Sequence, residues 1–191
     1  MGKCTLDTKA KKVACIINPP TGVDVFPPDF YTALNQWLLE NTDIYAYILH
    51  DLDILDETGE QKRAHVHVYF EGKTCRRLLA NLNGLADALG YNNDQISIEK
   101  ATSIEGCVQY MVHKNNPEKH QYDRREIVTN LTDQQIDGIM SRESVQVSLS
   151  AFMSAIASSN NKYQLIEKVG LEVYKEYRLV LLDLWNDLKR R

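Results

Sequence analysis

Four short segments of the chain are rich in apolar, often β-branched residues, in part alternating with polar ones, as strands buried on one or both faces do. We predict strands over residues 11–18, 44–49, 63–72 and 95–100. Residues two positions apart on a strand point to the same face of a sheet. In the third segment the apolar residues therefore face a core, and His65 and His67 lie together on the opposite face.

Segments with apolar residues at helical spacing separate and follow these strands. We expect helices over residues 29–41, 75–89, 103–116 and 131–140. The second helix is expected to have Thr74 as its N-cap and Gly90 as its stop. The third is expected to begin at a capping box, with Thr102 at the N-cap and Glu105 at N3.

The predicted order β-α-β-β-α-β-α is typical of a split βαβ arrangement, an α+β fold in which helices cover a ferredoxin- or RRM-like antiparallel sheet. The composition then changes, and we expect a main domain over residues 1–140, a polar hinge over 141–147 and a small all-α domain over 148–191. The stretch from Leu171 to Arg191 carries a wide apolar stripe at helical spacing. Such a stripe suits either a helical cap on the main domain or an oligomerisation surface.

Charge and cysteine usage restrict the class of protein. The net charge is −4, and residues 1–144 alone carry −6, which argues against a nucleic-acid partner unless the basic residues gather on one face. The four cysteines have no Cys-x-x-Cys spacing, so we expect a reducing cytoplasm and neither a disulfide framework nor a zinc knuckle. With no apolar run of membrane length and no secretory leader, we expect no membrane association.

His65 and His67 make half of a metal site. If strand 44–49 pairs with strand 63–72, His50 and Asp53 at the end of the first strand converge on the two histidines. Three imidazoles and one carboxylate suit Mn²⁺ or a similar borderline ion. Each residue alone is equally compatible with an ordinary polar role, but three of the five histidines fall within this hairpin.

Tyr110 is the candidate nucleophile. The sequence has no Gly-x-Ser-x-Gly, no plausible Cys–His pair and no P-loop, so hydrolases built on those motifs lack their parts. Lys114 is expected one helical turn after Tyr110, on the same face. A neighbouring ammonium favours the phenolate form of a tyrosine. A metal polarises the oxygens of the phosphoryl group that the phenolate attacks. Alone, such a pair is more often a core tyrosine beside a surface lysine.

Three motifs in this order resemble the HUH endonucleases, and more narrowly the RepB-type rolling-circle plasmid replication initiators. They are His50-Asp-Leu-Asp53, His65-Val-His67 and Tyr110-Met-Val-His-Lys114. The similarity extends from Tyr110 to Tyr122 and covers about residues 10–130.

This resemblance implies a site-specific single-strand DNA endonuclease and strand transferase, that is, a HUH nickase of the single-tyrosine class. Tyr110 would join the 5′ phosphate of the nicked strand and leave a free 3′-OH primer, with Lys114 positioning the phosphate. The divalent ion, Mn²⁺ as first choice and Mg²⁺ as second, would be held by His50, Asp53, His65 and His67.

The resemblance also implies partners. These are plasmid origin DNA, bound as a duplex and nicked as a single strand, the host replication machinery, and further copies of the chain, since RepB-type proteins assemble as hexameric rings. Glu105 and His113 are possible helpers in ending the reaction, with no role assigned. DNA contacts are expected from basic clusters, each of which also suits a solvated surface: Lys9, Lys11, Lys12, Lys62, Arg63, Lys73, Arg76, Arg77, Lys119, Arg124 and Arg125.

Three other interpretations remain open. A conjugative relaxase shares the metal-and-tyrosine design but usually places its nucleophile ahead of the histidine motif, whereas Tyr110 follows it. A non-catalytic RRM-like module has the same element order, but needs exposed aromatic residues on its central strands. A structural metal-binding module would lose no catalytic function when Tyr110 is changed.

Overall fold

The computed structural model describes residues 5–54, 58–142 and 154–169, together with Tyr174 and Trp185. The chain divides into two compact units, Met1–Arg142 and Glu143–Arg191. The three-segment division predicted above stays a prediction.

The first unit is an α+β fold, as predicted, built on a five-stranded antiparallel sheet of order β4-β1-β3-β2-β5. Two short 3₁₀ turns, Asn93–Gln95 and Arg124–Glu126, complete it. In chain order its strands and α-helices are β1 (Lys9–Ile17), α1 (Phe30–Asn41), β2 (Thr42–His50), β3 (His65–Arg77), α2 (Leu78–Leu89), β4 (Ile96–Lys100), α3 (Ile104–Met111), β5 (Val128–Thr129) and α4 (Asp133–Ser141).

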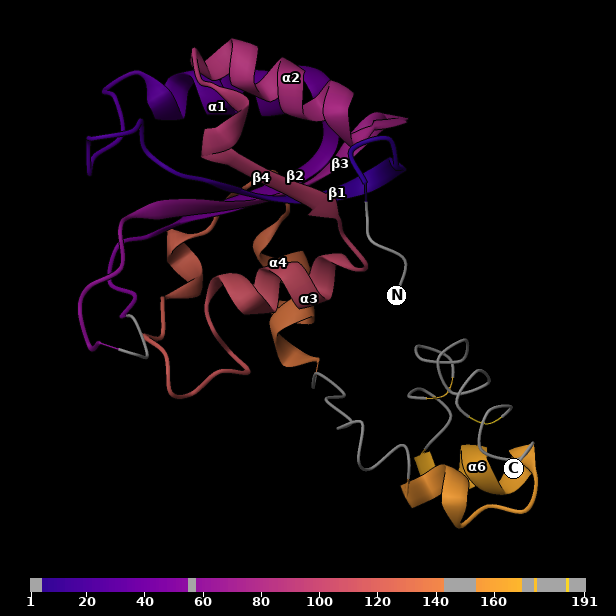
Figure 1. The fold of residues 1–191 in the computed structure, drawn as a ribbon. Helices are drawn as coiled ribbons and strands as arrows, with labels where there is room; N and C mark the ends of the chain where they lie inside the picture. Colours follow the sequence, from indigo (N-terminus) through magenta and orange to yellow (C-terminus); the bar gives the residue numbers. More distant parts are fainter. Residues whose placement is uncertain (1–4, 55–57, 143–153, 170–173, 175–184, 186–191) are drawn as a thin grey trace. The chain divides into compact units, whose positions relative to one another are not determined.

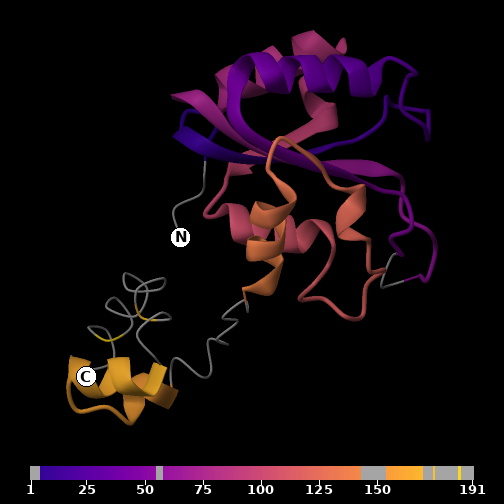
Figure 2. The same cartoon turned by 180° about the vertical axis from the view of Figure 1, so that it is seen from behind.

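Helices cover both faces of the sheet: α1 and α2 lie on one face, and α3 and α4 lie on the other (Figure 1 and Figure 2). The alternation along the strands places one set of apolar side chains against α1 and α2, as predicted. Fully burying a leucine or phenylalanine side chain contributes about 1.5–3 kcal/mol, so this layer is a main source of stability. Its buried residues include Val13, Ile17, Leu34, Leu38, Val66, Val68, Phe70, Leu82 and Leu85.

The second core lies on the opposite face. Ala46, Ile48 and Tyr69 of the central strands pack there against Val108 of α3 and Ile136 of α4. The odd-numbered residues of β3 point to this face, so the same alternation that buries the valines delivers the histidines to the α3 side. The site is therefore enclosed between the sheet and α3.

The start of the second helix differs from the prediction. Strand β3 continues to Arg77, so Thr74 is a strand residue and not an N-cap, and α2 begins at Leu78. Its first amides donate to backbone carbonyls instead of a capping side chain: Leu78 N–H bonds to Thr8 and Leu79 N–H to Leu6. The predicted stop is confirmed, because Gly90 adopts the left-handed conformation (φ 66°) that ends helices.

The cap of α3 is one residue later than predicted. The Ser103 hydroxyl, not that of Thr102, accepts a hydrogen bond from the Gly106 amide at 3.1 Å. Thr102 and Glu105 therefore form no capping box. The helix also ends earlier than expected, at Met111, which changes the position of every residue after it.

The fourth predicted helix is present with shifted bounds. Helix α4 runs from Asp133 to Ser141 and begins at a capping box of Thr132 with Gln135. Before it, the sequence analysis missed β5, a two-residue strand that pairs with β2 at Ala46 and Tyr47. A two-residue strand carries no alternation to detect.

In the second unit the structure describes a helical stretch at 154–157 and α6 (Lys162–Val169). The polar hinge, except for residues 141 and 142, lies outside the described residues, as does the final apolar stretch apart from Tyr174 and Trp185. No helix in the described part of the chain has the length and hydropathy of a membrane span.

Candidate metal and tyrosine site

Strand pairing brings the three hairpin histidines together. In the β2–β3 register His50 lies opposite His65, and His67 lies opposite Ile48. The ring centroids of His50 and His67 are 4.5 Å apart, and those of His65 and His67 are 4.9 Å apart. Potential ligand atoms of the three rings all lie within 4.8 Å of one another, so they fit a single divalent ion.

Asp53 is buried beside these rings. Its Oδ2 lies 3.3 Å from Nδ1 of His50 and 3.8 Å from Nε2 of His65. The loop that carries it is held by a 2.7 Å hydrogen bond from the Lys62 amide to the Asp53 carbonyl. Asp53 thus lies beside two of the three hairpin histidines, His50 and His65.

Backbone carbonyls orient two of the imidazoles. Nε2 of His50 donates to the Met111 carbonyl at 2.6 Å, and Nδ1 of His65 donates to the Arg63 carbonyl at 3.0 Å. A carbonyl only accepts, so each bond fixes the proton on that nitrogen and leaves the other nitrogen as the ligand atom. Metal-binding histidines are commonly held in this way.

The contact between His50 and Asp53 indicates whether this site can hold a cation. Burial lowers the pKa of His50 to about 4, so its ring is neutral near pH 7. Its Nδ1 therefore carries a lone pair, and this atom is buried without a hydrogen-bond partner in the described structure. This lone pair faces a carboxylate oxygen 3.3 Å away. Two electron-rich atoms so close inside a protein repel each other unless a cation lies between them.

His67 is also held neutral. Burial lowers its pKa to about 2, with a smaller contribution from the neighbouring His50. Neutral imidazoles and a carboxylate form a mixed nitrogen and oxygen donor set of the kind that binds borderline divalent ions. The residues therefore fit a divalent ion, without specifying which one.

His113 joins the site, although the sequence analysis assigned it no role. It is fully buried, and its Nδ1 donates to the His120 carbonyl at 2.7 Å and lies 3.8 Å from Oδ1 of Asp53. Its Nε2 is buried without a hydrogen-bond partner in the described structure. His50, Asp53 and His113 form a second group with ligand atoms within 4.8 Å, overlapping the first at His50.

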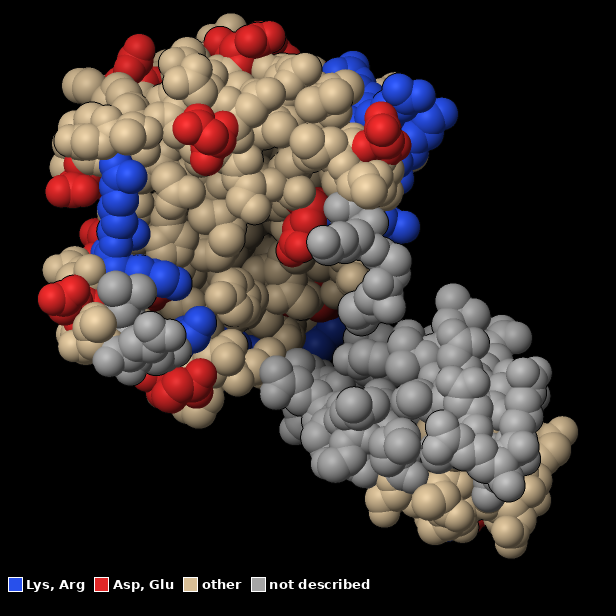
Figure 3. Space-filling model, in the orientation of Figure 1, with Lys and Arg blue, Asp and Glu red and all other residues tan. Residues whose placement is uncertain are grey.

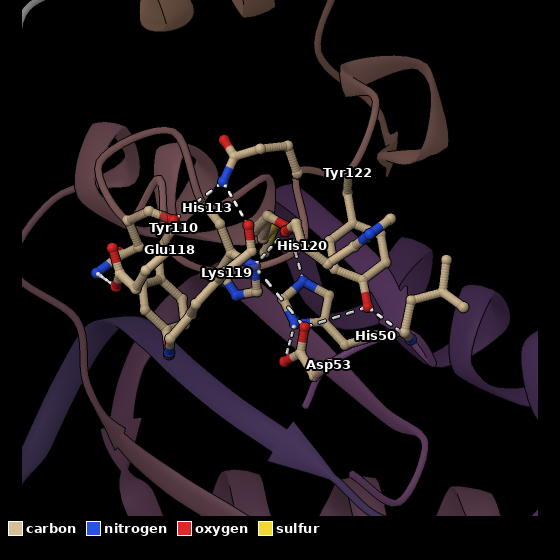
Figure 4. Close-up of polar contacts among 12 residues, drawn as sticks. His50, Asp53, Tyr110, His113, Glu118, Lys119, His120 and Tyr122 are labelled. Carbon is tan, nitrogen blue, oxygen red and sulfur yellow. Dashed lines mark hydrogen bonds and ion pairs between the residues drawn. The ribbon is translucent and has the colours of Figure 1, made fainter. Parts of the chain in front are cut away.

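Tyr122 contacts two of the candidate metal ligands, His50 and Asp53. Its ring stacks on His50 with centroids 4.3 Å apart, and its hydroxyl donates to Oδ1 of Asp53 at 3.2 Å (Figure 4). The same hydroxyl accepts from the Leu52 amide at 2.9 Å. Burial raises the pKa of Tyr122 to about 12, which keeps its donating proton in place. The only sequence signal for Tyr122 and His113 is their place in the segment from Tyr110 to Tyr122.

Tyr110 lies at the edge of this cluster. It is on the last turn of α3, 42% exposed, and its ring centroid is 5.4 Å from those of His67 and His113. The phenol is thus both beside the candidate metal ligands and open to solvent.

The expected pairing of Tyr110 with Lys114 is wrong. Helix α3 ends at Met111 and His113 takes a left-handed conformation (φ 54°), so Lys114 leaves the helical face. Its amine instead donates to the carbonyls of Met140 and Arg142 at the end of α4.

Lys119 lies where Lys114 was expected. Its Nζ is 3.4 Å from the Tyr110 hydroxyl and 5.4 Å from the ring centroid (Figure 4). The surrounding loop is held by its own bonds: the Lys119 amide donates to the Asn116 carbonyl, and the Gln121 side chain donates to the carbonyls of both residues. A structured loop, not a helical turn, brings an ammonium to the tyrosine.

The other possible helper, Glu105, is not beside the tyrosine hydroxyl. It pairs with Arg142, so the contact joins the start of α3 to the end of α4. Of the two, only His113 is in the cluster.

The predicted DNA-binding residues lie in separate places. Lys and Arg side chains gather over the ends of β1 and β3 and again beside the β2–β3 connection (Figure 3). Most form contacts within the protein: Lys11 with Asp43, Arg63 with Asp24, Arg77 with Asp7, Arg124 with Asp137, Arg125 with Asp123, and Lys73 with the last carbonyls of α1. Of this set, Lys119 is the one placed at the tyrosine.

The fold and the site together define the class: a split βαβ domain of the HUH type, with paired histidines on a central strand and a tyrosine on a following helix. Residues 5–137 match the family described as the origin-binding domain of plasmid replication proteins. The match covers more than half of the chain, which therefore belongs to this family.

Two relatives agree with this assignment. The chain is 33% identical over 110 residues to the replication protein RepB of Lactiplantibacillus plantarum, covering 56% of this chain and 46% of that protein. It is 30% identical over 97 residues to a replication protein of Onion yellows phytoplasma (strain OY-M), covering 45% of this chain and 24% of that protein. The matches thus cover less than half the length of either relative.

Proposed function

We propose that this protein initiates rolling-circle replication of a plasmid by binding the double-strand origin and nicking one DNA strand through Tyr110. The observation that carries the proposal is the position of Tyr110, an exposed phenol 5.4 Å, centroid to centroid, from the ring of one predicted metal ligand and within reach of Lys119. The family match supports the binding of plasmid origin DNA, which we propose as the substrate.

The proposed reaction is a transesterification at one phosphodiester. The Tyr110 oxygen attacks the phosphorus and loses its proton, the bond from phosphorus to the 3′ oxygen breaks, and that oxygen takes up a proton to become the free 3′-OH. The 5′ phosphate stays on Tyr110 as a phosphotyrosine. The phosphodiester bond is thus exchanged and not hydrolysed, which preserves it for rejoining.

His50, Asp53, His65 and His67 would hold a divalent ion, with Mn²⁺ as the first choice and Mg²⁺ as the second. Such an ion supplies Lewis-acid stabilisation of the phosphoryl oxygens. The Lys119 ammonium donates to the same phosphate from the solvent side. Lys114, the lysine implied by the family resemblance, is bonded to the end of α4, so we assign the phosphate contact to Lys119 instead.

Substitution of Tyr110 by phenylalanine tests the proposal. A labelled single-stranded origin oligonucleotide is incubated with protein and Mn²⁺, with and without chelator, and run on a denaturing gel. We expect a covalent adduct with the natural chain, none with chelator, and none with Tyr110→Phe despite unchanged oligonucleotide binding. Tyr163→Phe, which alters a tyrosine 85% exposed on α6, is the matched control and should form the adduct normally. Adduct formation by Tyr110→Phe would exclude the proposed nucleophile.

The proposed partners follow from the same assignment. Duplex origin DNA contacts the basic clusters, the host replication machinery extends the 3′-OH, and the protein acts in the cytoplasm. We propose that residues 148–191 assemble the chain into a multimer, a hexamer in the first instance. A light-scattering mass equal to one chain would contradict this assembly.

The structure disfavours the RRM-like alternative. RRM modules stack bases on aromatic residues of an open sheet face. Here helices cover both faces of the sheet, and the aromatic residues of its central strands, Tyr45, Tyr47, Tyr69 and Phe70, are buried. The order of tyrosine after histidine likewise favours an initiator over a relaxase.

A further inference from the structure

A pocket opens directly beside Tyr110, on the α3 side of the sheet. It has a volume of about 470 Å³, within the range of about 300–1,000 Å³ typical of small-ligand sites. His67 and Tyr110 belong to its lining, so the pocket begins at the proposed reaction centre. It continues under α3 across β1 to β4.

The strand register determines the pocket floor. Ser97 on β4, Ile16 on β1 and His67 on β3 form one row across the sheet. In the next row Glu99 lies beside Ala14. Adjacent strands are about 4.8 Å apart, so the far wall is about 10 Å from His67. That distance suits one nucleotide between its phosphate and the outer edge of its base.

Small residues create the space. Ala14 lies in the floor, and Gly106 of α3 lies in the opposite wall next to Cys107. A longer side chain at Ala14 would extend into the pocket, whereas a Cβ at Gly106 would meet the Ser103 hydroxyl at 3.3 Å. Burial raises the pKa of the Cys107 thiol to about 11, so this wall is uncharged near pH 7.

The charge at the Glu99 end of the pocket is unfavourable for a phosphate. Among the described residues that line the pocket, Glu99 is the acidic one, and neither lysine nor arginine contributes. A carboxylate without a nearby cation repels a phosphate but accepts hydrogen bonds from an amino group. The Lys119 ammonium, which attracts the phosphate, is at the Tyr110 hydroxyl and not in the lining.

We propose that this pocket binds the base of a nucleotide that flanks the scissile phosphate, and that Glu99 selects a base with an exocyclic amino group. Adenine, cytosine and guanine carry such a group and thymine does not, so thymine is the base rejected. The flat faces of the base lie between the apolar floor and α3, while the backbone stays at Tyr110. The assignment rests on the proposed nicking function and adds a sequence preference to it.

A binding selection tests the pocket without depending on the nicking reaction. The full chain carrying Tyr110→Phe is loaded with Mn²⁺ and used to select single-stranded oligonucleotides from a randomised pool. We expect one position at which thymine is disfavoured by about tenfold, the scale of one hydrogen bond to a charged group. In the same background, Glu99→Ala should reduce this preference to less than about twofold.

Two further variants make the result specific. Asp87→Asn removes one negative charge from an exposed residue of α2, on the opposite face of the sheet, and should leave the preference unchanged. Ser97→Trp fills the outer end of the pocket and should weaken binding of the selected oligonucleotide at least tenfold. The same variant should bind normally when the selected position carries an abasic nucleotide, because no base then needs the space.

Persistent discrimination in Glu99→Ala, or equal weakening of the intact and abasic oligonucleotides by Ser97→Trp, would overturn the pocket assignment. Melting followed by circular dichroism shows that each variant is folded. The adduct assay with an intact Tyr110 tests the proposed function separately: failure to form the adduct counts against nicking, while the base preference measured by binding decides the pocket.

Discussion

Backbone carbonyls determine the protonation of individual histidines in this site, one of them from 61 residues away in the sequence. The Met111 carbonyl holds His50, the Arg63 carbonyl holds His65, and the His120 carbonyl holds His113. Each bond places the proton on one ring nitrogen and leaves the other nitrogen with a free lone pair. The candidate ligands could be predicted from the sequence, but their protonation pattern depends on these backbone contacts.

The first prediction concerns metal affinity. His65→Asn removes one ligand atom and its fixed orientation, so Mn²⁺ affinity measured by calorimetry should fall at least tenfold. His120→Asn is the matched control, because the His120 side chain is exposed and its ring contacts Tyr122 edge-on, at 4.7 Å between centroids, while its backbone carbonyl holds His113. Equal Mn²⁺ affinities for the two variants would remove His65 from the metal site.

At the scale of elements, the position at which α3 ends determines which lysine lies beside Tyr110. The end of α3 at Met111 sends Lys114 to α4 and allows the following loop to return Lys119 to Tyr110. Helical spacing alone predicted the opposite pairing, because periodicity does not report where a helix stops. Element boundaries are the part of a fold that local patterns determine least.

The two lysines should therefore behave differently when each is replaced by methionine. Lys119→Met should slow adduct formation by about tenfold to a hundredfold at saturating oligonucleotide, because one charged donor to the phosphate is lost. Lys114→Met should instead lower the free energy of unfolding by about 1–2 kcal/mol, since the last carbonyls of α4 lose their donor. The measurements are single-turnover kinetics and urea unfolding. The reverse pattern would return the catalytic role to Lys114.

The cap of α3 gives a second comparison of neighbouring residues. Ser103→Ala should lower the free energy of unfolding by about 1 kcal/mol, since the Gly106 amide loses its acceptor. Thr102→Ala should change it by less than about 0.5 kcal/mol, because Thr102 lies outside the cap. Urea unfolding of the two variants decides between the two cap positions, and a larger effect at Thr102 would restore the predicted one.

At the scale of the whole molecule, the site is the product of two layers. The sheet supplies His50, His65 and His67, while α3 and the segment after it supply Tyr110, His113, Lys119 and Tyr122. Folding thus buries neutral imidazoles beside a carboxylate at some cost to stability. A bound divalent ion would offset that cost by binding only the folded state.

This burial predicts acid sensitivity of the metal-free protein. His50 and His67 have pKa values of about 4 and about 2 when folded, below the usual value of about 6.5 for an unfolded chain. Below pH 6.5 the unfolded chain therefore binds more protons than the folded protein, and the free energy of unfolding falls as the pH decreases. The loss is at most about 1.4 kcal/mol per pH unit for each histidine.

Urea unfolding in chelator between pH 7.5 and 5 measures this effect, in a range where most carboxylates remain ionised. Near pH 7.5, where the unfolded chain also leaves these histidines mostly neutral, they should contribute almost no slope. His120→Asn, which alters an exposed histidine, should retain the pH dependence. A constant free energy of unfolding from pH 7 to 5 would contradict the burial of neutral rings.

The sequence by itself determined the α+β class, the order of the elements apart from β5 and the face on which His65 and His67 lie, and it predicted four metal ligands and one tyrosine. These follow from periods of two and 3.6 residues, which are local properties of the chain, and from the expected pairing of two neighbouring strands. Only the tertiary structure decided that Lys119 takes the place of Lys114, that His113 and Tyr122 join the site, and that a pocket opens toward Glu99. These depend on where α3 ends and on contacts between residues distant in sequence, which no local period encodes.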